Sequence, residues 1–446
     1  MVASILHAVA RIKADVAEHL QAPMIEAICR ELGHAWRERI LTPVVTIHAF
    51  LLQVLHGNTA LDHVTRLMGG RFSGEAYGQA RRRLPLELFQ RLLSAVIGLL
   101  GACRDEAQRW CGHRVWLLDG SSGSMPDTPE LQRAFGQPGA QKPGCGFPVA
   151  HLLVLFHAGT GMVQKILTAP LRTHDAADAW RMHPELAPGD VLLADRGFCS
   201  FAHLAMLLTS GLFGVFRLHQ KTIVSFRKGR KHAPPRHSKR AKGLPRSRWI
   251  RWLGRRDQHV EYYKPASRPR WMSPEAYAAL PAAIEVRELR FAIVLPGMRT
   301  QEVTLVTTLL DPSRYPAEEL AQLYFDRWQV EVNLRHLKQT LHLDVLRSKT
   351  VDGVHKELCM IALVYNLVRL VMLEAARRQE TAPDRISFID ALRWLTNAHP
   401  DEPLPKLKVH RVRHRLEPRV RKRRPKQYPL MNRPRAELRK ALLNND

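Results

Sequence analysis

The order of apolar runs between residues 115 and 218 constrains the fold of this chain more than any other feature. Strand-like and helical stretches follow one another in a fixed order: strand-like 115–118, 147–156 and 162–168, helical 176–186, strand-like 191–194, helical 201–208 and strand-like 212–218. Strands in direct succession pair side by side, whereas strands separated by helices need crossovers that cover the sheet. The order therefore predicts an α/β fold, with a mixed sheet and flanking helices.

The first 110 residues or so have a helical pattern. Their apolar residues recur at steps of three and four, as on one face of a helix. Two helical stretches at 61–68 and 73–84 are separated by a pair of glycines, and the second carries Arg81, Arg82 and Arg83. A helix, a turn and a basic helix fit a DNA-binding unit whose arginines contact DNA. Two ordinary surface helices fit the spacing equally well.

Charge is concentrated in two segments. The 446 residues include 68 Lys and Arg against 41 Asp and Glu, a formal net charge of +27. Residues 226–256 hold thirteen basic residues and no acid, and residues 406–426 hold eleven basic residues and one acid, so the rest of the chain is nearly neutral. Such an excess favours a polyanionic partner, with nucleic acid ahead of an anionic membrane. An apolar content of 45% excludes disorder throughout.

The succession of strand-like and helical patterns suggests how the chain is divided into domains. Strand-like texture resumes at 284–295 and 303–309 after the basic run, and a long helical tract begins near residue 316. We therefore interpret the basic region as an insertion into the α/β domain. The predicted units are a helical N-terminal domain (1–110), the first part of the α/β domain (111–218), the basic insertion (219–300), the second part with its long helix (301–400) and a basic tail (401–446).

Cysteine usage and hydropathy indicate an intracellular protein. The six cysteines show no CxxC spacing, which argues against a structural zinc site or a disulfide framework. His7, Arg11 and Lys13 interrupt any apolar core of a signal peptide. The most apolar later stretch, 358–373, contains polar and basic residues and is too short to span a bilayer, so we expect a buried helix, a cytoplasmic location and no membrane partner.

Two aspartates share the same local sequence pattern. Asp119 and Asp195 each end a run of four apolar or small residues, and each is followed within two positions by glycine. A carboxylate at the end of a buried strand lies at the sheet edge where open α/β folds place their sites. Either residue alone would be typical of a turn. Together they favour a shared site at which both strands stop.

A third acid lies in the helical tract, in the pattern Tyr324-x2-Arg327-x3-Glu331-x6-Lys338. At about 100° per residue, the four side chains share one helical face. A solvated charged face would normally carry more than one acid. One carboxylate among an aromatic ring and two cations is better suited to phosphates and metal ions, and two Asp with one Glu suit Mg²⁺. Paired ions held in this way support in-line phosphoryl displacement.

These motifs resemble those of a known family. Leu118-Asp119-Gly120-Ser121, Asp195-Arg196-Gly197-Phe198 and the Tyr324, Arg327, Glu331, Lys338 signature are similar to motifs of the DDE transposases of bacterial insertion sequences, in the insertion-sequence-four family. The resemblance extends from about residue 30 to 440 and is weak in the basic insertion. It implies a ribonuclease H-like catalytic domain, a β-rich insertion between the second Asp and the Glu, and an all-α N-terminal domain that binds terminal inverted repeats.

The resemblance also implies roles for individual residues. Asp119, Asp195 and Glu331 would be catalytic and would bind Mg²⁺, with two ions in the site and Mn²⁺ as a substitute. Tyr324, Arg327 and Lys338 would contact phosphates near the element's end. Double-stranded DNA, as inverted repeats and as target, would be the partner, and a homodimer would pair two ends.

Some relatives hold a flipped base with a tryptophan of the insertion. Trp249, Trp252 and Trp271 are candidates here, although each alone is more typical of packing. Trp328, which follows Arg327, points off the signature face on helical geometry, and we expect a structural role for it.

The sequence as a whole predicts a transposase that binds inverted repeats, cleaves DNA at the element's ends with Mg²⁺ and joins the 3′-OH ends to target DNA. Two alternatives stay open at this point. One is a non-catalytic DNA-binding protein descended from such an enzyme, and the other is a structure-selective nuclease without strand transfer.

Overall fold

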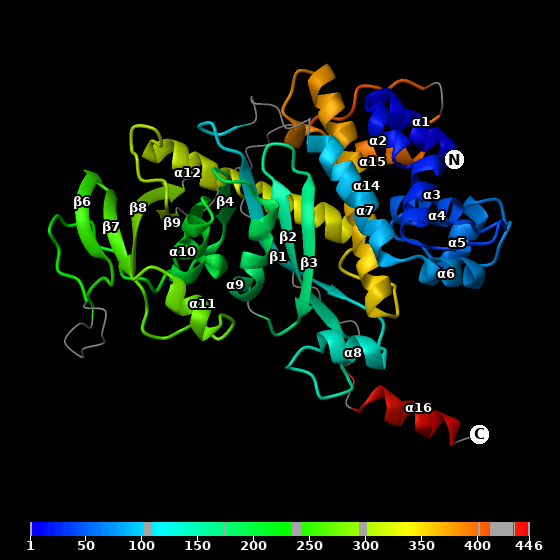
Figure 1. Cartoon of the computed structure of the whole chain (residues 1–446), viewed down its shortest axis with the longest axis horizontal. Helices are drawn as coiled ribbons and strands as arrows, with labels where there is room; N and C mark the ends of the chain where they lie inside the picture. The colour runs from blue at the N-terminus through cyan, green and yellow to red at the C-terminus, as the bar shows by residue number, and fades with distance from the viewer. Residues whose placement is uncertain are drawn as a thin grey trace, which may run out of the picture.

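The computed structural model describes residues 2–101, 109–173, 175–233, 243–293, 301–399, 402–410, 431 and 433–444. In this part of the chain the strands form one nine-stranded sheet in the order β3-β2-β1-β4-β5-β9-β8-β7-β6 (Figure 1). The strands are β1 (Val115–Ser124), β2 (Val149–His157), β3 (Val163–Pro170), β4 (Val191–Ala194), β5 (Phe213–Arg217), β6 (Arg248–Gly254), β7 (Asp257–Tyr263), β8 (Ala283–Ile293) and β9 (Gln301–Thr307).

The predicted mixed sheet is confirmed. β1, β4 and β5 are parallel neighbours, whereas β2 and β3 add to β1 as antiparallel strands. Helix α10 (Phe201–Thr209) connects β4 to β5, as the alternating texture indicated. The helix expected at 176–186 is only partly α-helical: α9 (Asp175–Asp178) gives way to a 3₁₀ stretch (Ala179–Glu185) that contains Pro184. Proline has no N–H for an α-helical ladder, which accounts for the change.

The strands of the predicted insertion continue the same sheet. β9 pairs with β5 on one side and with β8 on the other, so that Val306 lies opposite both Phe216 and Glu288. β8 then pairs with β7, and β7 pairs with β6. Helix α11 (Pro274–Ala279) lies between β7 and β8 in the chain. Residues 234–242 of the basic run lie outside the described residues.

The N-terminal unit is helical, as predicted (Figure 1). Its helices are α1 (Val2–Ile12), α2 (Ala14–Glu18), α3 (Ala22–Glu31), α4 (Pro43–Leu55), α5 (Leu61–Leu67), α6 (Gly74–Arg83) and α7 (Leu86–Leu100). Gly69 and Gly70 have positive φ, a region that glycine enters at little cost, and they make the turn between α5 and α6. The Ser73 hydroxyl accepts a hydrogen bond from the Ala76 N–H and caps α6.

Helices also cover the sheet and close the core. They are α8 (Pro129–Phe135), α12 (Ala317–Asp326), α13 (Gln329–Arg335), α14 (Val351–Arg378) and α15 (Phe388–Thr396). The last helix, α16 (Arg435–Leu443), has no buried residue. α14 is long and apolar enough to span a membrane, but 83% of its most apolar window is buried inside the protein. It is therefore a core helix, as predicted for 358–373.

The core is divided by the sheet. Leu117 packs in a cluster with the N-terminal helices and α14, whereas Trp116 and Leu118 pack on the opposite face with α10. The alternation follows from the two-residue period of a strand. The N-terminal helices and the sheet thus share one continuous apolar cluster.

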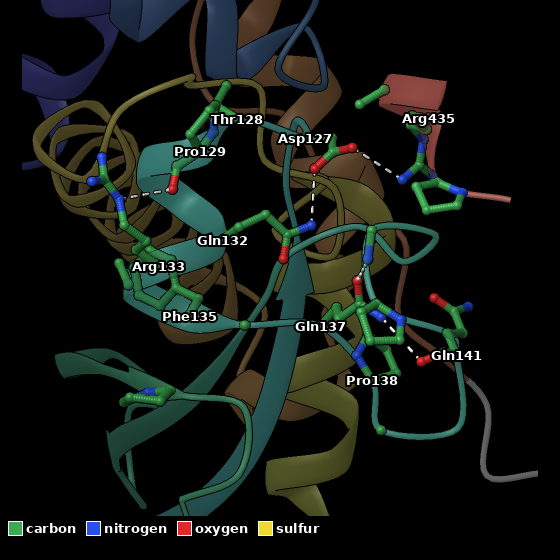
Figure 2. A pocket seen from close by; sticks show the side chains of 18 of the residues that line it. Asp127, Thr128, Pro129, Gln132, Arg133, Phe135, Gln137, Pro138, Gln141 and Arg435 are labelled. Atoms are coloured by element: carbon green, nitrogen blue, oxygen red, sulfur yellow. Dashed lines mark hydrogen bonds and ion pairs between the residues drawn. The ribbon is translucent and has the colours of Figure 1, made fainter. Parts of the chain in front are cut away.

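The C-terminal residues meet the body beside α8. A cavity of about 870 Å³ lies there, lined by α8, the loop that follows it and the start of α16. Figure 2 shows the side chains that line it. Arg435 Nη1 lies 3.1 Å from Asp127 Oδ2, and the guanidinium lies 3.9 Å from the centroid of Phe147. Residues 411–430 of the predicted basic tail lie outside the described residues.

Candidate active site

Asp119 and Asp195 lie on neighbouring parallel strands. The pairing of β1 with β4 ends where Leu118 faces Ala194, and each aspartate is the next residue along the chain. The expectation that β1 stops at Asp119 is wrong, because β1 continues to Ser124 in antiparallel pairing with β2. Hydrogen bonds to β2 hold this Gly- and Ser-rich segment extended after β4 has ended. The two carboxylates are still brought to one edge of the parallel part of the sheet.

The helical tract that carries Glu331 is not continuous. The Trp328 N–H donates to the Phe325 carbonyl and the Glu331 N–H donates to the Trp328 carbonyl, and these short-range bonds make a tight turn between α12 and α13. A π-helical turn (His336–Thr340) follows α13. The prediction of one regular helix from Tyr324 to Lys338 is therefore wrong.

Three residues of the signature still come together. The Arg327 guanidinium lies 5.4 Å from the centroid of the Tyr324 ring, and Arg327 Nη2 lies 3.9 Å from Glu331 Oε1. The Tyr324 hydroxyl donates a hydrogen bond of 3.2 Å to Asp195 Oδ1. Burial raises the pKa of Tyr324 above its ordinary value, Arg327 opposes this and Asp195 adds to it. Tyr324 is thus a fixed, protonated donor that joins α12 to the second aspartate.

The three acids share one electrostatic environment. Burial raises the pKa of Asp119 to about 6, the Gly120 N–H and Arg327 act to lower it, and the charges of Asp195 and Glu331 raise it further. The Gly120 N–H donates to Asp119 Oδ1 at 2.9 Å. The raised pKa shows that the charges already present compensate the ionised carboxylate incompletely.

Arg327 has an N–H donor without a partner in the described part of the chain. Its side chain is only 11% exposed, and its Nε has no hydrogen-bond partner among the described residues. A buried guanidinium N–H without an acceptor is costly unless a ligand supplies one. The positive charge of this guanidinium lies beside Glu331, where it would attract an oxyanion such as phosphate.

Sequence reasoning missed Arg217, which lies at the end of β5, one position beyond the pairing of Ala194 with Phe216. Its charge opposes the rise that burial causes in the pKa of the Tyr324 hydroxyl, and its place at the strand end puts it near the same edge of the sheet. The strand-end argument that found Asp119 and Asp195 could have found Arg217 if it had been applied to cations as well.

The other residues predicted to contact DNA differ in their exposure and in their partners within the protein. Lys338 lies in the π-helical turn and is half-buried, and among the described residues no hydrogen bond or ion pair joins it to the acids. Arg81 is occupied internally: it donates to Gln53 Oε1 at 2.8 Å, and its guanidinium lies 3.5 Å from the centroid of Phe50. Arg82 and Arg83 are exposed.

The candidate tryptophans also differ in their exposure to solvent. Trp252 is 42% exposed, with Lys228 Nζ 4.4 Å from its ring centroid, whereas Trp249 is half-buried and Trp271 packs against the core. Trp328 is 54% exposed. Its ring is therefore not packed in the core, as the expected structural role would require.

The three acids offer a donor set of the kind that binds hard divalent metals. No group of three or more His, Cys, Asp or Glu in the described part of the chain is already arranged around a metal position. The chemistry of the acids nevertheless fits, because two Asp and one Glu offer the hard oxygen donors that divalent cations of the Mg²⁺ type prefer. The raised pKa of Asp119 also marks a place where positive charge is lacking.

Comparison with known proteins decides the family. The family described as "Transposase DDE domain" matches residues 110–367, which is more than half of the chain. The chain belongs to the DDE transposases. Transposase InsG for insertion sequence element IS4, from Escherichia coli (strain K12), is 27% identical over 377 residues, covering 79% of this chain and 77% of that protein.

Other relatives agree with this assignment. Putative transposase InsZ of the same strain is 26% identical over 194 residues, covering 41% of this DDE transposase and 64% of the relative. Putative transposase InsL for IS186A is 47% identical over 45 residues, covering 10% of this chain and 12% of that protein. The resemblance to the IS4 family is confirmed, and the chain is an insertion-sequence DNA transposase with metal-dependent activity.

The match places the acids within the shared domain. Residues 110–367 of this transposase include Asp119, Asp195 and Glu331, together with the strands that carry the first two. The N-terminal helices α1 to α7 lie before the match.

Proposed function

We propose that Asp119, Asp195 and Glu331 are the catalytic acids of this transposase and hold Mg²⁺, as two ions that Mn²⁺ can replace. The observation that carries the proposal is the register of β1 and β4, which puts both aspartates directly after the last paired residues. The hydrogen bond from Tyr324 to Asp195 and the approach of Arg327 to Glu331 support the assignment of the third acid.

Side chains other than the three acids contact phosphate or position Asp195. Divalent ions bound by the acids would activate the attacking oxygen and stabilise the leaving oxygen of the scissile phosphate. Arg327 donates its unpartnered Nε–H to a phosphate oxygen, and Tyr324 holds Asp195 in place. Lys338 contacts a phosphate farther along the backbone, as a point charge.

The substrate is double-stranded DNA. The enzyme binds the terminal inverted repeats of its element, pairs two ends as a homodimer and acts in the bacterial cytoplasm. Water attacks at each end, and the freed 3′-OH then attacks target DNA at the same acids. The exposed Arg82 and Arg83 of α6 and the basic segments supply phosphate contacts, whose strength falls with rising salt.

Replacement of each acid by its amide tests the proposal. We expect each of three variants, Asp119→Asn, Asp195→Asn and Glu331→Gln, to cleave end-containing DNA about a thousandfold more slowly or worse in the presence of divalent metal. Each substitution removes a negatively charged ligand of the divalent ions. DNA binding without metal should persist. Glu318→Gln is the matched control, since Glu318 is exposed on α12 and should leave cleavage unchanged. Cleavage at the wild-type rate in any of the three amide variants would refute the assignment.

The same assay separates the alternatives. A non-catalytic DNA-binding protein would occupy the ends without cutting them, with or without divalent metal. A structure-selective nuclease would cut but would leave no 3′ ends joined to target DNA. The proposal requires both cut ends and joined products.

A further inference from the structure

The last residue of β1 is joined to the segment that follows the π-helical turn. The Ser124 N–H and the Ser124 hydroxyl both donate to the Asp344 carbonyl at 2.9 Å, and the Leu346 N–H donates to the Ser124 carbonyl at 2.8 Å. Ser124 and Val345 thus form a parallel bridge. The strand that carries the first of the three acids is therefore in direct backbone contact with the segment that leads away from Lys338.

The contact continues beyond Ser124. The Thr128 hydroxyl donates to the Lys349 carbonyl at 3.1 Å, and the Val351 N–H donates to Glu130 Oε1 at 2.8 Å. The end of β1 and the start of α8 thus run beside the link, which is the segment between the π-helical turn and α14. The link is held along its length and not at one point only.

Gly123 packs against the link so closely that no larger residue fits. It is buried, and a Cβ at this position would lie 2.7 Å from the Leu343 carbonyl oxygen. That oxygen belongs to the backbone, so relief of the clash requires a shift of the link or of β1. Leu343 and Leu346 are fixed in the core, with exposed fractions of 0% and 1%. Because protein cores are close-packed, the contact has little freedom to adjust.

The link begins where the π-helical turn ends. The Leu341 N–H donates to the His336 carbonyl at 3.1 Å, which is a bond of the π-helical turn. The Leu343 N–H donates to the Leu337 carbonyl at 3.0 Å. Lys338 lies within both of these hydrogen-bonded loops. A movement of Leu343 is therefore passed to the backbone of Lys338.

We propose that Gly123 and Ser124 are positioning residues for DNA cleavage: they fix the place of Lys338 relative to the three acids, and so the place of the phosphate that Lys338 holds. The inference rests on the proposed function and adds two residues to it. A strand rises about 3.3 Å per residue, so the distance along β1 from Asp119 to Ser124 is about 17 Å. Ser124 is therefore too far from the acids to touch the reacting phosphate, and it acts through the link.

A purely structural role for the contact makes a different prediction. If the contact only stabilised the fold, its loss would slow cleavage by the same factor whether or not Lys338 were present. If the contact acts through Lys338, its loss matters only while that lysine is there. A double-mutant cycle therefore separates the two roles.

The cycle combines Gly123→Ala with Lys338→Ala. Single-turnover cleavage of a duplex of the element's end is measured with Mg²⁺, at enzyme concentrations that saturate binding. Gly123→Ala should slow cleavage about tenfold to a hundredfold when Lys338 is present, because a misplacement of about 1 Å can cost about a hundredfold. When Lys338 is replaced, Gly123→Ala should slow cleavage less than about twofold further, because the two changes then affect the same contact.

Gly98→Ala is the matched control. Gly98 is exposed on α7, and an added Cβ meets no atom beyond the backbone of its own helix within 4 Å. This variant should cleave at the wild-type rate in both backgrounds.

Ser124→Ala repeats the test without a clash. It removes the hydroxyl donor to the Asp344 carbonyl, and it should slow cleavage about threefold when Lys338 is present and not when Lys338 is replaced. If Gly123→Ala does not fold, Ser124→Ala decides in the same way.

The outcomes separate this inference from the proposed function. A wild-type rate for Gly123→Ala, or equal losses in the two backgrounds, would overturn the inference and leave the three acids as proposed. A wild-type rate for Lys338→Ala would overturn the inference together with the role proposed for Lys338. The assignment of the acids is tested independently, by their amide variants.

Discussion

At the scale of single residues, a buried histidine pair supports the loop that carries Asp195. His203 Nδ1 donates to the Phe198 carbonyl at 2.8 Å, and the Nε2 atoms of His203 and His183 lie 2.9 Å apart. With the Nδ1–H of His203 on the carbonyl, its Nε2 accepts the hydrogen bond that His183 Nε2 donates, which requires a neutral His203 ring. Burial lowers the pKa of His203 to about 4 and that of His183 to about 3.

The pair makes stability depend on pH. Because the folded-state pKa values lie below the ordinary value of 6.5, the unfolded chain binds protons first as pH falls, and stability is lost between about pH 6.5 and 4. We expect a loss of about 3 kcal/mol over this range from His203 alone. His203→Asn keeps a donor near the Nδ1 position and should flatten the dependence in urea unfolding at pH 7, 5.5 and 4. If the free energy of unfolding fell equally with pH in the wild type and in His203→Asn, the prediction would be contradicted.

At the scale of elements, a buried carboxylate joins the N-terminal helices to the catalytic domain. Glu357 on α14 is 1% exposed and accepts hydrogen bonds from Asn58 Nδ2 at 2.5 Å and from the N–H groups of Arg347 and Ser348 at 2.9 Å. Gln53 connects Asn58 to Arg81 of α6. The basic helix is therefore positioned by contacts across the two units.

Glu357→Gln tests this connection. The amide would point an N–H₂ group at a donor in a buried site, which costs about 2 to 3 kcal/mol of unfolding free energy. Glu374→Gln on the same helix is the control and should cost less than about 1 kcal/mol, because Glu374 pairs with Arg377 and Arg378 near the surface. Equal melting temperatures for the two variants would count against the role of Glu357.

At the scale of the whole molecule, β9 joins the two ends of one sheet. Val306 is fully buried and lies opposite Phe216 of β5 and Glu288 of β8. Strands of the predicted insertion and the strands next to the aspartates thus belong to one sheet, linked through β5 and β9, and share a core cluster. We expect them to unfold together.

Val306→Ala should show this coupling. The lost methyl groups and the cavity should cost about 2 kcal/mol. Hydrogen exchange should accelerate by a similar factor in β7 and in β2, on opposite sides of β9, if the sheet is one cooperative unit. Acceleration confined to β7 would show that the insertion unfolds alone.

Much of this arrangement follows from local sequence. The strand-like runs around Asp119 and Asp195 and the glycine turn before α6 correspond to real elements, because hydrophobic period and glycine conformation are local properties. The end of β1 was misplaced, since the extension of Gly120 to Ser124 depends on pairing with β2. The break at Trp328 likewise has no local helix breaker in the sequence.

The sequence by itself determined which residues could do the chemistry: three acids, an aromatic ring and cations at spacings typical of a DDE transposase. Only the tertiary structure decided which cations are exposed and which are packed inside the protein. Arg81 and Arg83 are two positions apart on α6, yet the first is stacked inside the domain and the second lines an open cavity with Arg37 and Arg71. Charge is a property of the residue, but its availability depends on neighbours that the fold brings from elsewhere in the chain.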